Sequence, residues 1–369
     1  NCIGGYTRSE NTYSYAAAEV IIPHVLGGNL MEILTQQTSW QSICGNTKLM
    51  VAFGGLPAFN SQVSNGGTGA HIQRTGVREA AANGTRFVNL SPRRSDVKSD
   101  IEEDWIQLRP NTDVAVMLAM CHTLLVERLH DQSFLNQFTT GFDRFAAYLR
   151  GESDGTPKTA VWAAAISGMA AEDIVTLSRQ MAAERTMLTV SWSLTRQQFG
   201  EQPFWAVVAL AAMIGDMGKP GGGVGFGYTI TNYLGNNVFK MPYAPLPQGR
   251  NAVADFIPVA RVSDMLLRPG QPFDYDGQQY LYPDDQEYTC AIFKCDGIDF
   301  RSLIIKRELS EGFTSKGEVV ENTKIKEKEL RDLIYNRLRK QPEDLESEKQ
   351  LVDKKLKTHL NRAKIIVIE

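Results

Sequence analysis

The chain has 369 residues, a formal net charge of −3, 43% hydrophobic residues and 22% charged residues. These values are typical of a soluble globular protein with a sizeable core. A nearly neutral chain lacks the basic face of a general nucleic-acid binder, so no nucleic-acid partner is expected. The longest apolar runs, residues 114–126 and 204–215, are shorter than the roughly 18 residues that suggest a membrane span. Both runs are therefore predicted to be buried helices, and no membrane span is expected.

The first residues contain neither an initiator Met nor a basic region followed by an apolar stretch. The sequence thus predicts no secretory signal and a start inside a longer protein. The five cysteines are irregularly spaced, and only Cys290 and Cys295 lie close together. No second Cys pair or His pair follows them, so free thiols are favoured over a zinc or iron–sulfur site.

In chain order, the segments 48–53, 85–90 and 186–191 are short and apolar on both faces, which predicts buried parallel strands. Helices are expected between them at about 112–129, where Thr112 and Asp113 suit a helix start, and at 171–183 and 202–217. This alternation predicts an α/β fold, with a mainly parallel sheet and helices on both faces.

The composition changes near Asp284. From there on roughly two residues in five are charged, against about one in six before it. Leu330, Ile334 and Leu338 share one helical face, and Pro342 is expected to end that helix. The sequence therefore predicts two parts: residues 1–284, and a charged, mostly helical tail over residues 285–369.

The loops that follow the three predicted strands contain Gly, Ser, Trp and Arg at 54–57, 91–94 and 192–196. In a parallel sheet these loops share the carboxyl edge, where ligands bind. Such residue types suit a nucleotide, although ordinary turns would explain them equally well. The Gly-rich segment 221–227 follows a helix and lacks both G-x-G-x-x-G and the Walker A lysine, so it is predicted to be an extended loop.

A series of motifs then runs along the first 280 or so residues. The first joins Gly4-Gly5, Tyr13-Ser14, a small-residue helix and Pro23-His24-Val25; the others are Gln36–Trp40, Arg109–Asp113, Thr140–Asp143, Gly151–Gly155, Trp192–Arg196, Gly200–Gln202, Pro220–Gly223 and Pro258–Leu267. In this order they resemble the dimethyl sulfoxide reductase family of molybdopterin oxidoreductases. Phe53–Pro57 and Asn232-Tyr233 are similar to the biotin sulfoxide and trimethylamine N-oxide reductase branch.

The resemblance implies an oxotransferase that reduces an S-oxide or N-oxide and is itself re-reduced by an electron donor of unknown identity. It implies molybdenum bis(molybdopterin guanine dinucleotide) as the cofactor. Ser14 matches the family's catalytic metal ligand, an oxygen donor suited to a hard, high-valent metal. The alternative for Ser14 is a helix N-cap.

The resemblance also implies contacts to the cofactor at eight positions: Asn60, Gln62, Ser91, Pro92, Arg94, Asp113, Trp192 and Arg196. Asp113 matches a carboxylate that binds a guanine edge, and Trp192 and Arg196 match a segment near a pterin. A helix cap for Asp113 and core packing for Trp192 remain open alternatives.

The chain departs from the family pattern at three places. Asn11-Thr12 precede Tyr13-Ser14 where the family often has Gly-Asp. Phe59 stands where lysine is common, which predicts one phosphate contact fewer, and Phe199 stands where a His precedes Gly-Glu-Gln. Family members are more than twice as long as the matching part, so residues 1–284 are expected to be a fragment, and the tail over residues 285–369 is expected to be unrelated to the family. Two hypotheses stay open: a cofactor-binding oxotransferase, or an inactive truncated or chimeric α/β fragment with a helical interaction tail.

Overall fold

The computed structural model describes 8–62, 71–96, 103–236, 256–261, 272–275 and 278–281, the positions 6, 101, 249–251, 264, 267–268, 270–271 and 277, and the backbone of 287–291 and 363–367. The chain divides into two compact units. One unit is Tyr13–Met241, and the other combines Asn1–Thr12 with Pro242–Glu369.

A five-stranded sheet forms the centre of the first unit. Its strands are β2 (Leu49–Phe53), β3 (Arg86–Leu90), β4 (Asp104–Ile106), β5 (Thr186–Val190) and β6 (Gly223–Phe226). They lie in the order β4-β3-β2-β5-β6, and every neighbouring pair is parallel. The predicted α/β class and three of its strands are thus confirmed.

Strand β6 corrects one prediction. The Gly-rich segment expected to be a loop contains Gly223–Phe226, which pairs with β5 in a register that sets Phe226 opposite Val190. Glycines are tolerated here because the backbone is closely approached: a Cβ on Gly225 would lie 2.9 Å from Cζ of Tyr228.

Helices surround this sheet. They are α1 (Ala16–Leu26), α2 (Leu30–Gln36), α3 (Trp40–Asn46), α4 (Ile72–Ala82), α5 (Asp113–Val126), α6 (Gln132–Phe138), α7 (Phe142–Leu149), α8 (Ala160–Ser167), α9 (Ala171–Ala183) and α10 (Gln202–Ile214), with short 3-10 helices η1 (Ala58–Gln62), η2 (Arg94–Asp96) and η3 (Trp192–Thr195). Helix α9 has the predicted bounds. Helix α10 ends earlier than predicted because Gly215 adopts a left-handed φ of 76° and its N–H closes onto Ala211.

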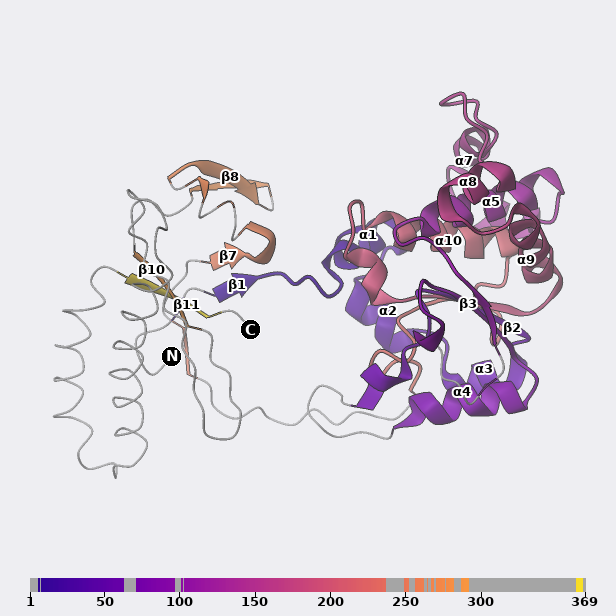
Figure 1. Cartoon of the computed structure of the whole chain (residues 1–369), viewed down its shortest axis with the longest axis horizontal. Helices are drawn as coiled ribbons and strands as arrows, with labels where there is room; N and C mark the ends of the chain where they lie inside the picture. The colour runs from indigo at the N-terminus through magenta and orange to yellow at the C-terminus, as the bar shows by residue number, and fades with distance from the viewer. Residues whose placement is uncertain are drawn as a thin grey trace. The chain divides into compact units, whose positions relative to one another are not determined.

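Two cores lie on opposite faces of the sheet. In β2, Leu49, Val51 and Phe53 join a core with residues of α5, α9 and α10, whereas Met50 and Ala52 join a second core with residues of α3 and α4. Figure 1 shows α3 and α4 on one side of β2 and β3, and α5, α9 and α10 on the other. The predicted helices on both faces are therefore present.

The two longest apolar runs of the sequence form α5 and α10, and most residues of both helices are buried. No single described helix is long and apolar enough to cross a membrane, although two bent pairs, α1 with α2 and α8 with α9, reach that length and composition together.

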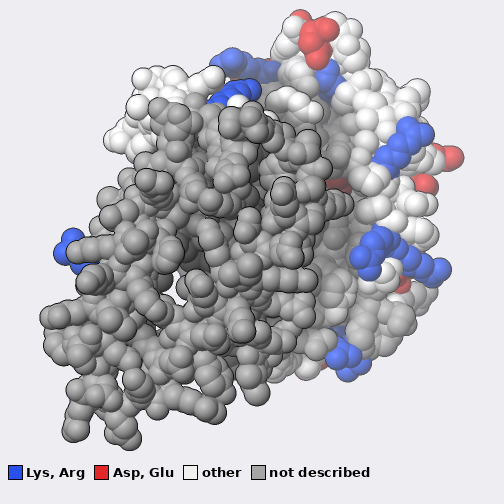
Figure 2. Space-filling model, turned by 60° about the vertical axis from the view of Figure 1, so that its left-hand side comes forward, with Lys and Arg blue, Asp and Glu red and all other residues white. Residues whose placement is uncertain are grey.

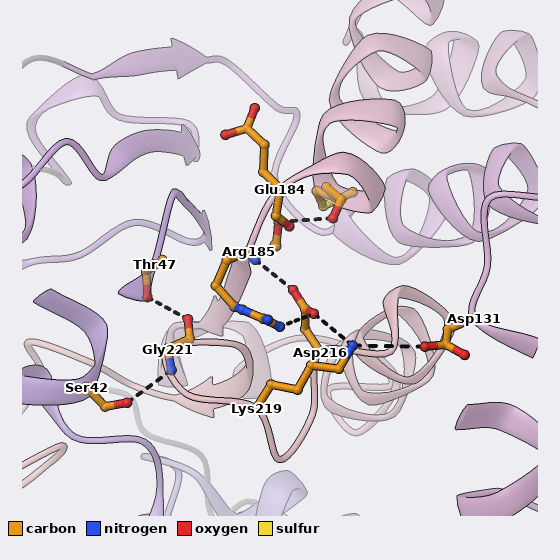
Figure 3. Close-up of polar contacts among 10 residues, drawn as sticks. Ser42, Thr47, Asp131, Glu184, Arg185, Asp216, Lys219 and Gly221 are labelled. Atoms are coloured by element: carbon orange, nitrogen blue, oxygen red, sulfur yellow. Dashed lines mark hydrogen bonds and ion pairs between the residues drawn. The ribbon is translucent and has the colours of Figure 1, made fainter. Parts of the chain in front are cut away.

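Polar contacts fasten the amino-terminal edge of the sheet (Figure 3). Asp216 lies just after α10, is 8% exposed, pairs with Arg185 and accepts a 2.9 Å hydrogen bond from the Thr186 backbone N–H. Lys219 lies 3.4 Å from Asp216 and 4.0 Å from Asp131, the N-cap of α6. This cluster joins the start of β5 to the ends of two helices.

A second set of contacts at the same edge holds the turn before β6 (Figure 3). The hydroxyl of Thr47 donates to the carbonyl of Gly221 at 2.5 Å, and the Gly221 N–H donates to the hydroxyl of Ser42 at 3.0 Å. These contacts bind the chain before β6 to the segment before β2.

The second unit contains three strand pairs. β1 (Arg8–Glu10) is parallel to β7 (Phe256–Pro258), β8 (Pro272–Tyr275) is antiparallel to β9 (Gln278–Leu281), and β10 (Glu287–Ala291) is parallel to β11 (Ala363–Val367). The described residues of the predicted tail are thus two strands. The helix predicted over 330–338 lies outside the described residues, and the boundary near residue 284 stays a prediction.

Candidate functional site at the carboxyl edge of the sheet

The order of the strands marks where a ligand would enter. The chain moves outward in one direction through β2, β3 and β4, and then returns to place β5 and β6 on the other side of β2. In open parallel sheets, ligands bind at such a reversal, beyond the carboxyl ends of the two adjacent strands. The loops that follow β2 and β5 therefore define the candidate site.

Those two loops are packed directly against each other. Gly54 follows β2 with a φ of 81°, and a Cβ on it would lie 2.5 Å from Cδ1 of Leu194 and 2.8 Å from Cβ of Ser191. The Gly54 N–H donates to Leu90 O, and the Ser191 N–H donates to Phe53 O, each at 2.9 Å. Only a glycine permits this backbone conformation and close approach.

The loop after β2 continues into η1, which carries two of the predicted cofactor residues. Asn60 is exposed, and its backbone N–H donates to Pro57 O at 3.0 Å. Gln62 ends η1, and its side chain lies outside the described residues. The neighbouring Phe59 is 54% exposed, so η1 presents both an amide and an aromatic ring at the surface.

The loop after β3 carries three more. Ser91 is buried, and its hydroxyl donates to Arg93 O at 2.7 Å, so in this structure it stabilises its own turn. Pro92 and Arg94 are exposed, and Arg94 O accepts a 3.4 Å hydrogen bond from Nδ2 of Asn89. The turn thus presents the Arg94 guanidinium, a group suited to phosphate, at the same edge.

The loop after β5 is the short helix η3. Trp192 is 6% exposed, and its Nε1 finds no hydrogen-bond partner within the part of the chain that the structure describes. The ring lies against Gly227 at the end of β6, where a Cβ would come within 2.7 Å of Cδ1 of Trp192. A buried indole N–H that lacks a partner among the described residues can be satisfied by an acceptor on a bound ligand.

Arg196 is the C-cap of η3 and is exposed. Its backbone N–H donates to Ser193 O at 3.1 Å, and no ion pair to its guanidinium is found among the described residues. The side chain is therefore available to an anionic ligand.

Ser14 belongs to the turn before α1 and is exposed. The N-cap of α1 is Tyr15, which makes no side-chain cap hydrogen bond, so the N-cap alternative for Ser14 is wrong. The Tyr15 ring lies 4.7 Å from that of Trp192, centroid to centroid, and Oγ1 of Thr195 donates to Ser14 O at 3.3 Å. The structure thus brings Ser14 beside the loop after β5.

Asp113 is the first residue of α5 and is 7% exposed. Burial raises the pKa of this carboxyl to about 6, while a hydrogen bond from its own backbone N–H acts in the opposite direction. A buried carboxylate at a helix start is well placed to accept hydrogen bonds from a ligand. The chain reaches Asp113 from the carboxyl end of β4, whose C-terminus lies at the same edge of the sheet.

The residues at this edge fit a large, anionic, hydrogen-bonding group. The site offers an indole N–H that has no partner among the described residues, two exposed arginines and a buried carboxylate, and the glycine loops leave its backbone open to close approach. The described residues contain no group of three or more His, Cys, Asp or Glu side chains that could hold a metal ion.

Three contributors to the site were not identified from the sequence. Tyr15, Thr195 and Gly227 hold Ser14 and Trp192 in place, and Tyr15 and Thr195 lie within motifs that the resemblance had already marked.

On the face shown in Figure 2, basic side chains of the described surface occur in separate small groups, with a few acidic ones among them.

Comparison with known proteins is consistent with this geometry. A family model described as molybdopterin oxidoreductase matches residues 1–367. The chain is 42% identical over 321 residues to a biotin sulfoxide reductase of Cereibacter sphaeroides, covering 87% of this chain and 42% of that protein. It is 43% identical to a dimethyl sulfoxide/trimethylamine N-oxide reductase of the same organism, covering 77% of this chain and 35% of that protein.

A trimethylamine-N-oxide reductase of Haemophilus influenzae is 36% identical, with 77% of this chain and 35% of that protein covered. The chain therefore spans well under half the length of these curated relatives. Among solved structures, acetylene hydratase from Pelobacter acetylenicus matches 55% of this chain and 25% of its own, at 21% identity and a TM-score of 0.39.

Proposed function

This chain belongs to the molybdopterin oxidoreductase family, and we propose that it forms one part of a molybdenum oxotransferase that reduces S-oxides or N-oxides. The substrate class follows from the names of the relatives, which are biotin sulfoxide, dimethyl sulfoxide and trimethylamine N-oxide reductases. The proposed cofactor is molybdenum bis(molybdopterin guanine dinucleotide), which supplies the two-electron oxygen-atom transfer when bound.

In this proposal Ser14 provides the single protein oxygen to the metal. Ser14 is exposed, precedes the first turn of α1 and lies beside the loop after β5. A hard, high-valent metal prefers an oxygen donor, and the hydroxyl must lose its proton to bind it. The positive end of α1 close by favours that loss, because helix N-termini stabilise negative charge.

Trp192 and Arg196 orient the pterin portion. The indole N–H of Trp192 is a buried donor that has no partner in the described part of the chain, so an acceptor on the ligand would satisfy it. Arg196 and Arg94 are exposed cations at the same edge that can pair with the phosphates of the two dinucleotides.

The remaining predicted residues bind the nucleotide ends. Asp113 accepts hydrogen bonds from a guanine edge, for which its buried carboxylate is suited. Asn60, Gln62, Ser91 and Pro92 line the loops after β2 and β3, where the backbone and the amide side chains bind ribose and phosphate oxygens.

One observation carries the proposal. The turn of Ser14 lies against the loop of Trp192 through the Tyr15 ring contact and the Thr195 hydrogen bond. Segments from opposite ends of the unit are thereby joined at the switch point of the sheet, where a ligand is expected.

The test is reduction of an oxide by the purified chain isolated from cells that make the cofactor. Reduced methyl viologen supplies the electrons, since the physiological donor is not known. We expect viologen oxidation that depends on dimethyl sulfoxide, trimethylamine N-oxide or biotin sulfoxide, and that is lost in Ser14→Ala. Absence of oxide-dependent oxidation in the wild-type chain would contradict the proposal and favour the non-catalytic fragment.

A further inference from the structure

Thr195 lies between the two segments that meet at the site. It is 8% exposed, and it is the last residue of η3. Its hydroxyl oxygen is 2.7 Å from Trp192 O and 3.3 Å from Ser14 O. One hydroxyl has a single proton, so it is shared between two carbonyl acceptors, and the shorter contact takes the larger share.

The backbone of Thr195 is itself held firmly. Gly200 packs closely on Thr195. A Cβ on Gly200 would overlap the carbonyl group of Thr195 and would lie 2.9 Å from the Cα of Thr195. Phe199, immediately before, adopts a left-handed φ of 58° although it is not glycine. Such strain persists only where the surrounding structure imposes it.

These contacts fix the conformation of η3. The position of the Ser14 turn relative to η3 therefore depends on the contacts between them. Two described contacts attach the turn to η3, namely the Tyr15 ring on Trp192 and the Thr195 hydroxyl on Ser14 O. The ring contact fixes the approach of α1, because Tyr15 is its N-cap. The hydroxyl acts on the backbone of Ser14 itself.

We infer that Thr195 is a positioning residue, whose hydroxyl sets the backbone of Ser14 relative to the pterin-binding loop. The inference rests on the proposed function, in which Ser14 binds the metal and the loop after β5 binds the pterin. The hydroxyl touches neither the cofactor nor the metal in this account, and it acts only through the carbonyl of Ser14.

The direct measurement is amide hydrogen exchange of the 13–18 segment in the purified chain without cofactor. Thr195→Val keeps the shape and removes the hydroxyl, whereas Thr195→Ser keeps the hydroxyl. We expect exchange in this segment to rise about three- to fivefold in Thr195→Val and to stay within about twofold in Thr195→Ser, because a shared hydrogen bond contributes less than a full one.

Thr123→Val is the matched control. Thr123 is a buried threonine of α5 whose hydroxyl donates to Ala119 O at 2.9 Å. Loss of its hydroxyl is expected to leave exchange over 13–18 unchanged. Unchanged exchange in Thr195→Val, or an equal rise in Thr123→Val, would overturn the inference.

A second readout connects the residue to the metal. In chain isolated with cofactor, we expect molybdenum to be lost during dialysis about three- to fivefold faster from Thr195→Val than from wild type, with Thr195→Ser restoring retention. Equal retention of molybdenum in wild type, Thr195→Val and Thr195→Ser would overturn the inference that Thr195 positions Ser14. A wild-type chain without molybdenum would refute the proposed function, while the exchange measurement would still decide whether Thr195 holds the turn.

Discussion

The ring of Tyr15 lies 4.7 Å from that of Trp192, with an angle of 56° between the ring planes. Tyr15 begins the first helix of its unit, and Trp192 begins the loop after β5. Their contact is the packing interaction that places Ser14 beside the predicted pterin loop.

This contact can be measured by a double-mutant cycle. Tyr15→Leu and Trp192→Leu, alone and together, should give a coupling free energy of about 0.5–1.5 kcal/mol in chemical denaturation, because aromatic pairs contribute that much beyond their buried area. Additive single effects would show that the two rings do not stabilise each other.

The second prediction concerns the close approach of β6 to Trp192. Gly227 and Gly84 have similar left-handed φ angles, 77° and 88°, but a Cβ on Gly84 meets nothing within 4 Å, whereas one on Gly227 strikes the Trp192 ring. Gly84→Ala should cost about 1–2 kcal/mol of unfolding free energy from backbone strain alone. Gly227→Ala should cost about 1–3 kcal/mol more, from overpacking against the indole.

Tryptophan emission provides a second check on the same pair of variants. Gly227→Ala should shift the emission of Trp192 as the ring moves, and Gly84→Ala should not. Equal losses of stability with unchanged emission would mean that the ring is not confined by Gly227.

The third prediction follows from the raised pKa of Asp113, about 6 in the folded chain against an ordinary 3.8. Because the folded state holds the proton more tightly, the stability that this group contributes is present below about pH 3.8 and is lost as the pH rises through about 6. Asp113→Asn should therefore stabilise the chain without cofactor by about 2–3 kcal/mol at pH 7, and by nearly nothing at pH 3.8.

Urea unfolding of wild type and Asp113→Asn at several pH values measures this difference. A difference that does not vary between pH 4 and pH 7 would contradict the burial argument. A carboxylate that destabilises the chain without cofactor is explained if it is retained for binding a ligand.

The fourth prediction concerns Asp216 at the opposite edge of the sheet. Its carboxylate pairs with Arg185 and accepts the Thr186 N–H, and its side chain is only 11% exposed. Asp216→Ala should lower the unfolding free energy by about 2–3 kcal/mol, since it leaves a partly buried arginine and a backbone N–H without partners. Lys219→Ala should cost under about 1 kcal/mol, because that side chain is 46% exposed.

Thermal or denaturant unfolding of both variants distinguishes the two contributions. Similar small losses in both would show that the Asp216 cluster (Asp216, Arg185 and Lys219) adds little to stability. Because the cluster lies away from the carboxyl edge, neither substitution is expected to alter cofactor contacts.

The sequence predicted the fold where the strands are long and apolar. β2, β3 and β5 were identified because bulky residues fill both faces, as in buried parallel strands. β6 was missed because its glycines resemble a loop; in the structure Tyr228 closely approaches Gly225, and Gly223 has a left-handed φ of 99° beside Met217. β4 was missed because it has three residues, one of them an exposed Asp104.

For the site, the order of motifs indicated Ser14 and Trp192, but not what holds them together. Tyr15, Thr195 and Gly227 act through contacts between segments far apart in the chain, and no spacing rule reveals such contacts. The N-cap interpretation of Ser14 failed for a local reason, since the helix begins one residue later.

The molybdenum and guanine nucleotide content of the purified chain shows directly whether it binds molybdenum bis(molybdopterin guanine dinucleotide). Metal analysis, with chromatography of the nucleotide released by acid hydrolysis, gives both values from one preparation. If the chain binds this cofactor, we expect molybdenum with about two guanine nucleotides per metal atom in wild type, and a marked loss of molybdenum in Ser14→Ala. A wild-type chain that carries neither molybdenum nor guanine nucleotide would contradict it.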